Sequence, residues 1–183
     1  MAVHLWQQAF EGFLAAEAVT GLSPEDLEAL SEAAFWSGNS LPALDARQRA
    51  YNAYVDQGRS TEAASAALVT CTLYFMNGDT AVASGWLGRA QRLLVELPEC
   101  TGHAQLAWLE AQLMLLLKGH DQALDKAQEV EAIAARVGDH DLVNLGICMQ
   151  GNLRLHTGDV RGGMRLLDEA LAAALAGELG PLS

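Results

Sequence analysis

The fold is decided by the stretch Leu73-Tyr-Phe-Met-Asn-Gly78-Asp79-Thr-Ala-Val-Ala83-Ser-Gly-Trp-Leu-Gly-Arg-Ala90. A segment with helical composition runs into Gly78, a common helix stop, and Asp79 is a typical N-cap residue for a following helix. Ala83 and Ala90 are seven residues apart, about two turns of α-helix, so they form one flat stripe. Because a neighbouring helix can approach such a stripe closely, the stretch predicts an antiparallel helical hairpin.

Similar breaks recur along the chain at intervals of about twenty residues, the length of one helix and a short turn. They are Gly38, Gly58, Gly78, the Pro98-Glu99 pair, Gly119, Gly138, Gly158 and Gly177. Between them apolar residues recur at helical spacing, and no segment alternates as a strand does. Nine helices are therefore predicted, at about residues 3–17, 24–37, 41–56, 60–77, 80–96, 102–118, 121–137, 140–157 and 160–176.

The stripe of small residues recurs in the second helix of most predicted hairpins. The pairs are Ala9 and Ala16, Ala43 and Ala50, Ala83 and Ala90, and Gly163 and Ala170, while the third hairpin departs from the pattern with Ala123 and Val130. The first helix carries this stripe, so we expect residues 1–22 to be the second half of a repeat. Four hairpins are then predicted at about 23–58, 59–98, 99–138 and 139–178, all in one repeat domain over residues 1–183.

Length, composition and charge exclude several classes of protein. The chain has 183 residues, is 51% hydrophobic, and has a formal net charge of −12. It is too apolar to be disordered, and without a basic surface it is not expected to bind nucleic acid directly. Its apolar runs are far shorter than the roughly 20 residues that cross a bilayer, and its three cysteines form no CxxC motif. We therefore expect a folded cytoplasmic protein that does not enter a membrane.

The predicted hairpin, with its Gly-Asp turn and two small residues seven apart in the second helix, resembles the tetratricopeptide repeat (TPR). Cys71, Ala111 and Gly151 take the small position of the first helix. The period of about forty residues exceeds the usual period of about thirty-four, which implies longer helices. The resemblance implies an all-α fold, a right-handed superhelical α-solenoid of antiparallel helix hairpins with about nine helices. The first helices of the hairpins would line its concave face.

The order of three segments also resembles the repeat region of bacterial LuxR-type transcriptional regulators. These segments begin at Ser23-Pro-Glu-Asp, at Ala81-Val-Ala-Ser-Gly-Trp and at Gly162-Gly-Met-Arg. The resemblance covers nearly the whole chain and implies a module of a bacterial regulatory system. Such regulators often end in a helix-turn-helix domain, for which this sequence has no counterpart, so no DNA-reading role is carried over.

The predicted concave face is the candidate binding site, and it combines apolar residues, amides and an acidic end. It comprises Glu28, Glu32, Phe35, Trp36, Leu68, Thr72, Phe75, Met76, Gln105, Trp108, Gln112, Cys148, Asn152 and His156. Such a face suits an amphipathic helix or an apolar ligand. The competing interpretation is that its aromatic residues only fill the core between adjacent hairpins, and the sequence leaves both open.

Recognition is the predicted role of the protein. A clamp for a peptide carboxylate needs basic residues, whereas Glu28 and Glu32 have the opposite charge, so we expect a basic or neutral protein or peptide partner. The alternative is a small apolar effector molecule enclosed by Phe35, Phe75 and Trp108. No nucleophile motif, metal-ligand spacing or phosphate-binding loop occurs, so we expect no enzymatic activity, no metal and no cofactor.

The last predicted helix, which contains Met164, is apolar on more than one side. A terminal repeat needs a polar outer face because nothing stacks on it. We therefore expect either a homodimer through the C-terminal hairpin or a longer natural array.

Overall fold

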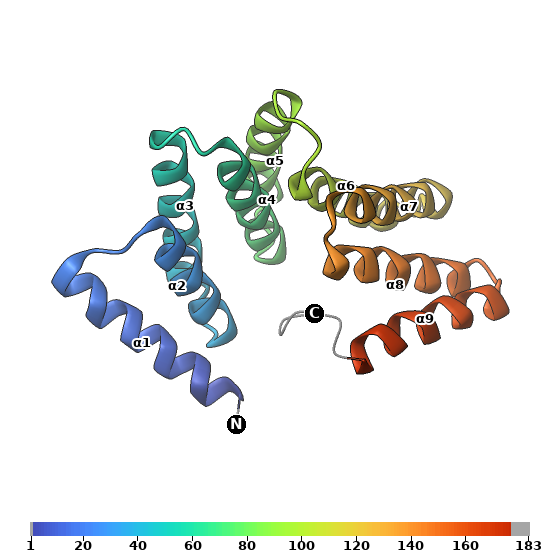
Figure 1. The fold of residues 1–183 in the computed structure, drawn as a ribbon, viewed down its shortest axis with the longest axis horizontal. Helices are drawn as coiled ribbons and strands as arrows, with labels where there is room; N and C mark the ends of the chain where they lie inside the picture. Colours follow the sequence, from blue (N-terminus) through green and yellow to red (C-terminus); the bar gives the residue numbers. More distant parts are fainter. Residues whose placement is uncertain (1, 177–183) are drawn as a thin grey trace. The chain divides into compact units, whose positions relative to one another are not determined.

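The computed structural model describes residues 2–176, and within this range it contains nine α-helices and no strand (Figure 1). The helices are α1 (Ala2–Thr20), α2 (Pro24–Trp36), α3 (Ser40–Asp56), α4 (Ser60–Met76), α5 (Thr80–Val95), α6 (Thr101–Leu116), α7 (His120–Val137), α8 (His140–His156) and α9 (Val160–Leu175). The predicted fold class and the predicted helices are confirmed, and each helix begins and ends within a few residues of its prediction. None of the described helices is long and apolar enough to span a bilayer.

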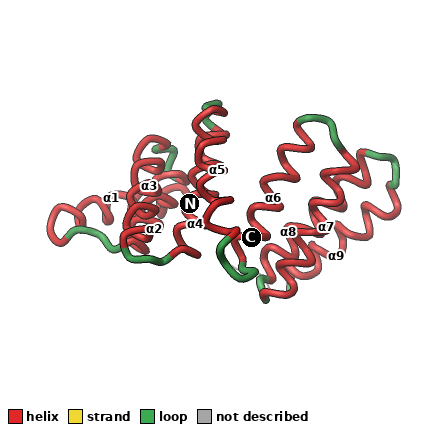
Figure 2. Tube along the Cα trace, turned by 90° about the horizontal axis from the view of Figure 1, so that it is seen from above, coloured by secondary structure: helices red, strands yellow, loops and turns green. Residues whose placement is uncertain are grey.

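The chain divides between Leu97 and Pro98 into two compact units. Unit 1 contains α1 to α5, and unit 2 contains α6 to α9. Within each unit, consecutive helices pack side by side in antiparallel order and are joined by short loops (Figures 1 and 2). The division falls at the predicted boundary between the second and third hairpins. One repeat domain over the whole chain stays a prediction.

The turns contain the residues that the sequence marks as helix stops and caps. Gly78 and Gly158 have φ of +84° and +92°, a conformation that glycine adopts at little cost. The Asp159 carboxylate accepts a hydrogen bond from the Gly162 amide at 2.9 Å and caps α9. Asp79 stands at the N-cap of α5 but makes no side-chain cap bond. The predicted pair of stop and cap is therefore complete at the second turn, and only the stop is confirmed at the first.

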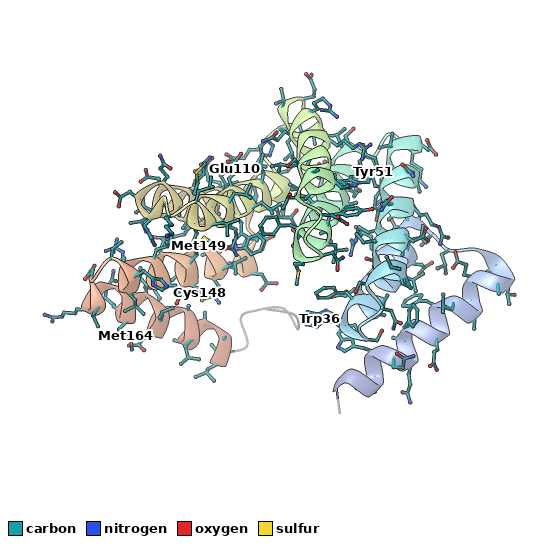
Figure 3. All side chains as sticks on the ribbon, turned by 180° about the vertical axis from the view of Figure 1, so that it is seen from behind. Trp36, Tyr51, Glu110, Cys148, Met149 and Met164 are labelled. Atoms are coloured by element: carbon teal, nitrogen blue, oxygen red, sulfur yellow. The ribbon has the colours of Figure 1, made fainter. Side chains whose placement is uncertain are left out.

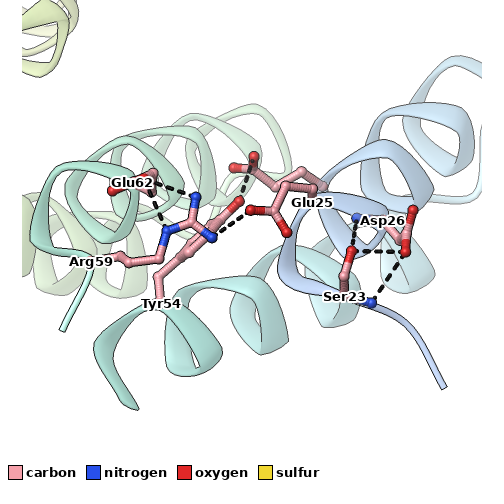
Figure 4. Close-up of polar contacts among 7 residues, drawn as sticks. Ser23, Glu25, Asp26, Tyr54, Arg59 and Glu62 are labelled. Carbon is pink, nitrogen blue, oxygen red and sulfur yellow. Dashed lines mark hydrogen bonds and ion pairs between the residues drawn. The ribbon is translucent and has the colours of Figure 1, made fainter. Parts of the chain in front are cut away.

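Helix α2 begins with a capping box formed by Ser23 and Asp26. The Ser23 hydroxyl accepts a hydrogen bond from the Asp26 amide at 3.1 Å, and the Asp26 carboxylate accepts one from the Ser23 amide at 3.2 Å (Figure 4). Pro24 occupies the first turn, where a missing N–H costs nothing. This reciprocal capping box fixes where α2 starts, and therefore which of its residues face α3.

The predicted pairs on α3, α5, α7 and α9 are buried, and they set how closely the helices approach. The predicted pair on α1 is not buried, because Ala9 is half-buried and Ala16 is exposed. Ala43, Ala50 and Ala90 are fully buried in unit 1. In unit 2, a Cβ added to Gly163 of α9 would lie 2.7 Å from the backbone oxygen of Gly151 in α8. Because that distance is far below van der Waals contact, α8 and α9 can cross at this spacing only without a side chain at Gly163.

We predict that Gly163→Ala destabilises the protein by about 1–3 kcal/mol, because the added methyl meets backbone that cannot move aside easily. Gly85→Ala is the matched control, since a Cβ added to Gly85 would have no atom within 4 Å. That substitution should stabilise α5 by about 0.5–1 kcal/mol. Urea unfolding followed by circular dichroism measures both changes. Equal effects of the two substitutions would contradict the close crossing of α8 and α9.

Candidate functional site

An open groove of about 350 Å³ lies between α6 and α8 of unit 2. It is lined by Trp108, Gln112 and Leu115 of α6 and by Leu145, Cys148, Met149, Asn152, Leu153 and His156 of α8. Five of these residues, Trp108, Gln112, Cys148, Asn152 and His156, belong to the predicted concave face. The structure therefore brings most of the predicted residues of the third and fourth hairpins together around one hollow.

Helical spacing explains why these side chains share the groove. Trp108 and Gln112 are four residues apart on α6, and Cys148, Asn152 and His156 follow one another at the same interval on α8. Residues four apart lie on one face of a helix, one turn above the other. The two faces meet because α6 and α8 are the first helices of adjacent hairpins.

The floor of the groove is apolar and belongs to the core of unit 2. Met149 and Leu153 are buried on α8, next to buried Ala111 of α6, and Trp108 and Leu115 pack against the same cluster (Figure 3). Trp108 is therefore half-buried, with part of its ring in the core and part in the groove lining. The ring of Trp108 is thus shared between the core and the groove lining, and ligand binding by this residue stays a prediction.

The rim of the groove is polar but has little charge. Gln112 and Asn152 have side-chain amides, and the Asn152 amide donates a hydrogen bond to the Cys148 carbonyl oxygen at 3.1 Å. Burial raises the pKa of the Cys148 thiol, which keeps it neutral. His156 lies with its ring centroid 6.4 Å from that of His120. Apart from Cys148 and His156, the residues that line the groove have no ionisable side chain.

Gln105, the remaining residue predicted in unit 2, is half-buried on α6 and is not among the residues that line the groove. It lies seven residues, about two helical turns, before Gln112, at the N-terminal end of the same face. The groove therefore begins beyond the first turns of α6 and α8 and extends to their C-terminal ends.

Glu28 of unit 1 is engaged inside the hairpin of α2 and α3. Its Oε1 accepts a hydrogen bond from Arg47 Nη1 at 2.7 Å, and its Oε2 accepts one from Tyr54 Oη at 3.0 Å. The Arg47 side chain is only 12% exposed, and burial lowers its pKa against the opposing effect of the Glu28 carboxylate. Because both carboxylate oxygens have partners, Glu28 stabilises the hairpin and offers little to a ligand.

The other predicted residues of α2 are divided between core and surface. Phe35 packs against the core of unit 1, and Glu32 is half-buried. Trp36 is 50% exposed and lies against Trp6 of α1, with ring centroids 6.5 Å apart (Figure 3). Trp36 also contacts the Phe35 ring edge to face at 5.1 Å. These aromatic residues join α1 to α2.

The predicted residues of α4 are divided in the same way. Leu68 is buried, and the Thr72 hydroxyl donates to the Leu68 carbonyl oxygen within the helix at 3.1 Å. Phe75 is half-buried, while Met76 is 63% exposed at the end of the helix. In unit 1, therefore, only Trp36 and Met76 of the predicted set present large exposed apolar surfaces.

A second polar cluster in unit 1 is not evident from the sequence. The Arg59 guanidinium binds the carboxylates of Glu25 and Glu62 and lies 4.6 Å from the centre of the Tyr54 ring (Figure 4). Hydrogen bonding to Arg59 lowers the pKa of Glu25. Arg59 and Glu25 are far apart in sequence, and no local spacing rule links them, so only the packing of the hairpins reveals the pair.

Other polar groups of the described chain form no site for a metal. Within residues 5–176, no group of three or more His, Cys, Asp or Glu side chains is placed to hold an ion. Cys100 stands at the N-cap of α6, with its Sγ 3.5 Å from Nδ1 of His103. That imidazole nitrogen also accepts a hydrogen bond from the Cys100 amide at 3.2 Å, so the pair closes the first turn of the helix.

Comparison with known proteins identifies similar folds. A search of family models finds no match, and a search of curated proteins also finds none. Among solved structures, BtubC (BKLC) from P. vanneervenii is 14% identical with a TM-score of 0.61, covering 94% of this chain and 73% of its own. Nearly identical TPR-like repeats of a Podosopora anserina kinesin light chain protein are 17% identical with a TM-score of 0.52, covering 98% and 88%.

The neighbours show that the chain has a TPR-like helical repeat fold, as the sequence predicts. At 14% and 17% identity they show the fold alone. The resemblance to LuxR-type regulators stays a prediction.

We predict that Tyr54→Phe lowers the unfolding free energy by about 1 kcal/mol near pH 7, because it removes the hydrogen bond to Glu28. Burial, together with the nearby Glu28 carboxylate, raises the pKa of Tyr54 above its ordinary value of about 10. The folded protein thus keeps a proton that the unfolded chain loses, so stability falls as pH rises above about 10.

Tyr54→Phe should lack this loss of unfolding free energy at alkaline pH, because it has no phenol at position 54 to lose a proton. The variant and the wild type should therefore converge in stability at high pH. Urea unfolding at a series of pH values measures the difference. Tyr51→Phe, on the same helix, is the control and should follow the wild type throughout. A constant difference between Tyr54→Phe and wild type at every pH would contradict the assignment.

Proposed function

We propose that this protein is a non-enzymatic TPR-like scaffold that binds a protein or peptide in the groove between α6 and α8. The observation that carries the proposal is the meeting of Trp108, Gln112, Asn152 and His156 around one open hollow with an apolar floor. An aromatic ring beside amides can hold an apolar side chain and hydrogen-bond the backbone next to it.

The expected partner segment is neutral or basic and contains an apolar residue. The groove lining contains no carboxylate and no lysine or arginine, so it offers no ion pair to a charged residue of the partner. The net charge of −12 on the whole chain repels an acidic partner at long range and favours a basic one. Charge therefore acts on the encounter, while apolar contact with Trp108 provides the affinity.

The setting that we propose is a bacterial transcriptional regulatory system in the cytoplasm. Support for it comes from the sequence resemblance to LuxR-type regulators. Further partners are expected at the C-terminal hairpin, where a second copy of the chain would bind. Direct contact with nucleic acid is not part of the proposal, because the chain has 23 acidic and only 11 basic residues.

A small-molecule effector is the second candidate ligand, and the size of the groove supports it. A volume of about 350 Å³ lies at the lower end of the roughly 300–1,000 Å³ range of ligand pockets. Such a ligand would stack on Trp108 and lie over Met149 and Leu153. Native mass spectrometry of the chain purified from its host separates the two candidates, since a retained effector adds a fixed small mass and a peptide-binding scaffold retains none.

We predict that random peptides displayed on phage and selected on the full chain are enriched in apolar residues and depleted in acidic ones. Asn152 is exposed, and an arginine at this position would fill the groove. Asn152→Arg should therefore lower the affinity for the selected peptides at least about tenfold, roughly 1.4 kcal/mol. Asn77→Arg, at an exposed amide after α4, is the matched control and should leave affinity unchanged. Fluorescence anisotropy measures both, and equal affinity for the two variants would place peptide binding outside the groove.

A further inference from the structure

Helix α9 is apolar on two sides. One side, with Gly163, Leu166 and Ala170, is buried in unit 2. The other side is a stripe of four solvent-exposed residues, which includes Met164 (Figure 3). We call it the α9 stripe: Val160, Met164, Leu171 and Leu175, exposed by 59%, 47%, 57% and 80%.

Comparison with α7, the second helix of the preceding hairpin, shows what covers the face that corresponds to the α9 stripe. Helices α7 and α9 correspond with a shift of forty residues, which aligns Ala123 with Gly163 and Glu131 with Leu171. On α7 this face is covered by α8, because a Cβ added to Gly146 would lie 2.9 Å from the backbone nitrogen of Glu131. The α9 stripe is therefore a face that the repeat uses for helix packing, here exposed to solvent.

The residue at this position differs between the two helices, Glu131 on α7 and Leu171 on α9, so each needs a different kind of surface opposite it. The Glu131 carboxylate on α7 accepts a hydrogen bond from the Gln150 amide of α8 at 2.5 Å. Leucine at the corresponding position of α9 offers no polar group and needs an apolar surface opposite it. A helix that covers the α9 stripe must therefore present apolar residues of its own.

Charge makes α9 suitable for contact with an identical chain. The charged residues of α9 are Arg161, Arg165, Asp168 and Glu169, two of each sign, and all four are exposed. The helix is thus locally neutral, although the whole chain carries a net charge of −12. Two copies can approach through α9 without the repulsion that opposes contact through most other surfaces.

The residues of the α9 stripe are symmetrically spaced, so two copies of the stripe can match each other. Successive members are four, seven and four residues apart, and this order is the same from either end of the helix. In an antiparallel pair of α9 helices related by a two-fold axis, Met164 of each copy faces Leu171 of the other. Val160 then faces Leu175. A two-fold interface requires such self-complementarity.

We infer that the α9 stripe is the interface of a two-fold symmetric homodimer in which the two α9 helices pack antiparallel. The stripe extends about 22 Å along the helix, at about 1.5 Å per residue, so the interface is small. Interfaces of this size usually give reversible complexes of modest affinity. The inference rests on the self-association part of the proposed function and is independent of the groove between α6 and α8.

Sedimentation velocity of the full chain, from low micromolar to several hundred micromolar, tests the dimer. The expected result is a rise in mass with concentration from the 19.5 kDa of one chain toward twice that value. Leu171→Glu should raise the dissociation constant at least tenfold, about 1.4 kcal/mol. The control Leu41→Glu changes another exposed leucine, 78% exposed on α3 against 57% for Leu171, and should have no effect. A wild-type chain that stays monomeric throughout overturns the inference.

The antiparallel register has its own test. Met164→Lys alone should weaken the dimer as Leu171→Glu does, whereas the double variant Met164→Lys/Leu171→Glu should recover it, because each lysine faces a glutamate of the other copy. Recovery should disappear at high salt. Failure of the double variant to recover overturns the proposed register. Peptide binding by Leu171→Glu serves as the independent readout: its retention, with loss of the dimer, separates this interface from the groove.

Discussion

Close approach of helices at positions without a bulky side chain is the constraint on which both units depend. Unit 2 shows it most clearly, because α8 contacts α7 through Gly146 and α9 through Gly151, and Gly163 of α9 meets the backbone of α8. Alanines at 0% exposure, such as Ala43 and Ala50, have the same role in unit 1. Dense packing leaves no room for a methyl group at these glycines or for a larger side chain at these alanines, so the small residues set the spacing of the hairpins.

The groove follows from this packing. Because α8 uses its glycines for contact with α7 and α9, its remaining face, with Cys148, Asn152 and His156, is left for the groove beside α6. The polar residues of unit 1 are arranged differently. There Glu28 of α2 binds Arg47 of α3, and Glu25 of α2 binds Arg59, so these carboxylates stabilise the packing of the helices. The predicted residues of the two units thus lie in different surroundings, around a hollow in unit 2 and within ion pairs and core in unit 1.

The proposed self-association and the proposed recognition of a partner involve separate faces of unit 2. The groove lies on first helices, α6 and α8, whereas the α9 stripe lies on a second helix and carries neither Trp108 nor the amides. A scaffold with this arrangement could hold two copies of a partner without competition between the two contacts. The physical distinction is between an apolar floor with amides, which suits a peptide, and an uninterrupted apolar stripe, which suits another helix.

The sequence by itself determined the all-α fold, the helix boundaries, the cap at Ser23 and the small residues at the crossings. These features depend on residues close together in the chain, through helical spacing, glycine conformation and local hydrogen bonds. Tertiary structure decided which predicted residues lie together around one hollow. Glu28 became a structural ion pair because Arg47 and Tyr54 of the next helix reach it, while Trp108, Gln112, Asn152 and His156 met in one groove. Which face of a helix remains accessible depends on the helices packed around it, and those neighbours come from distant parts of the chain.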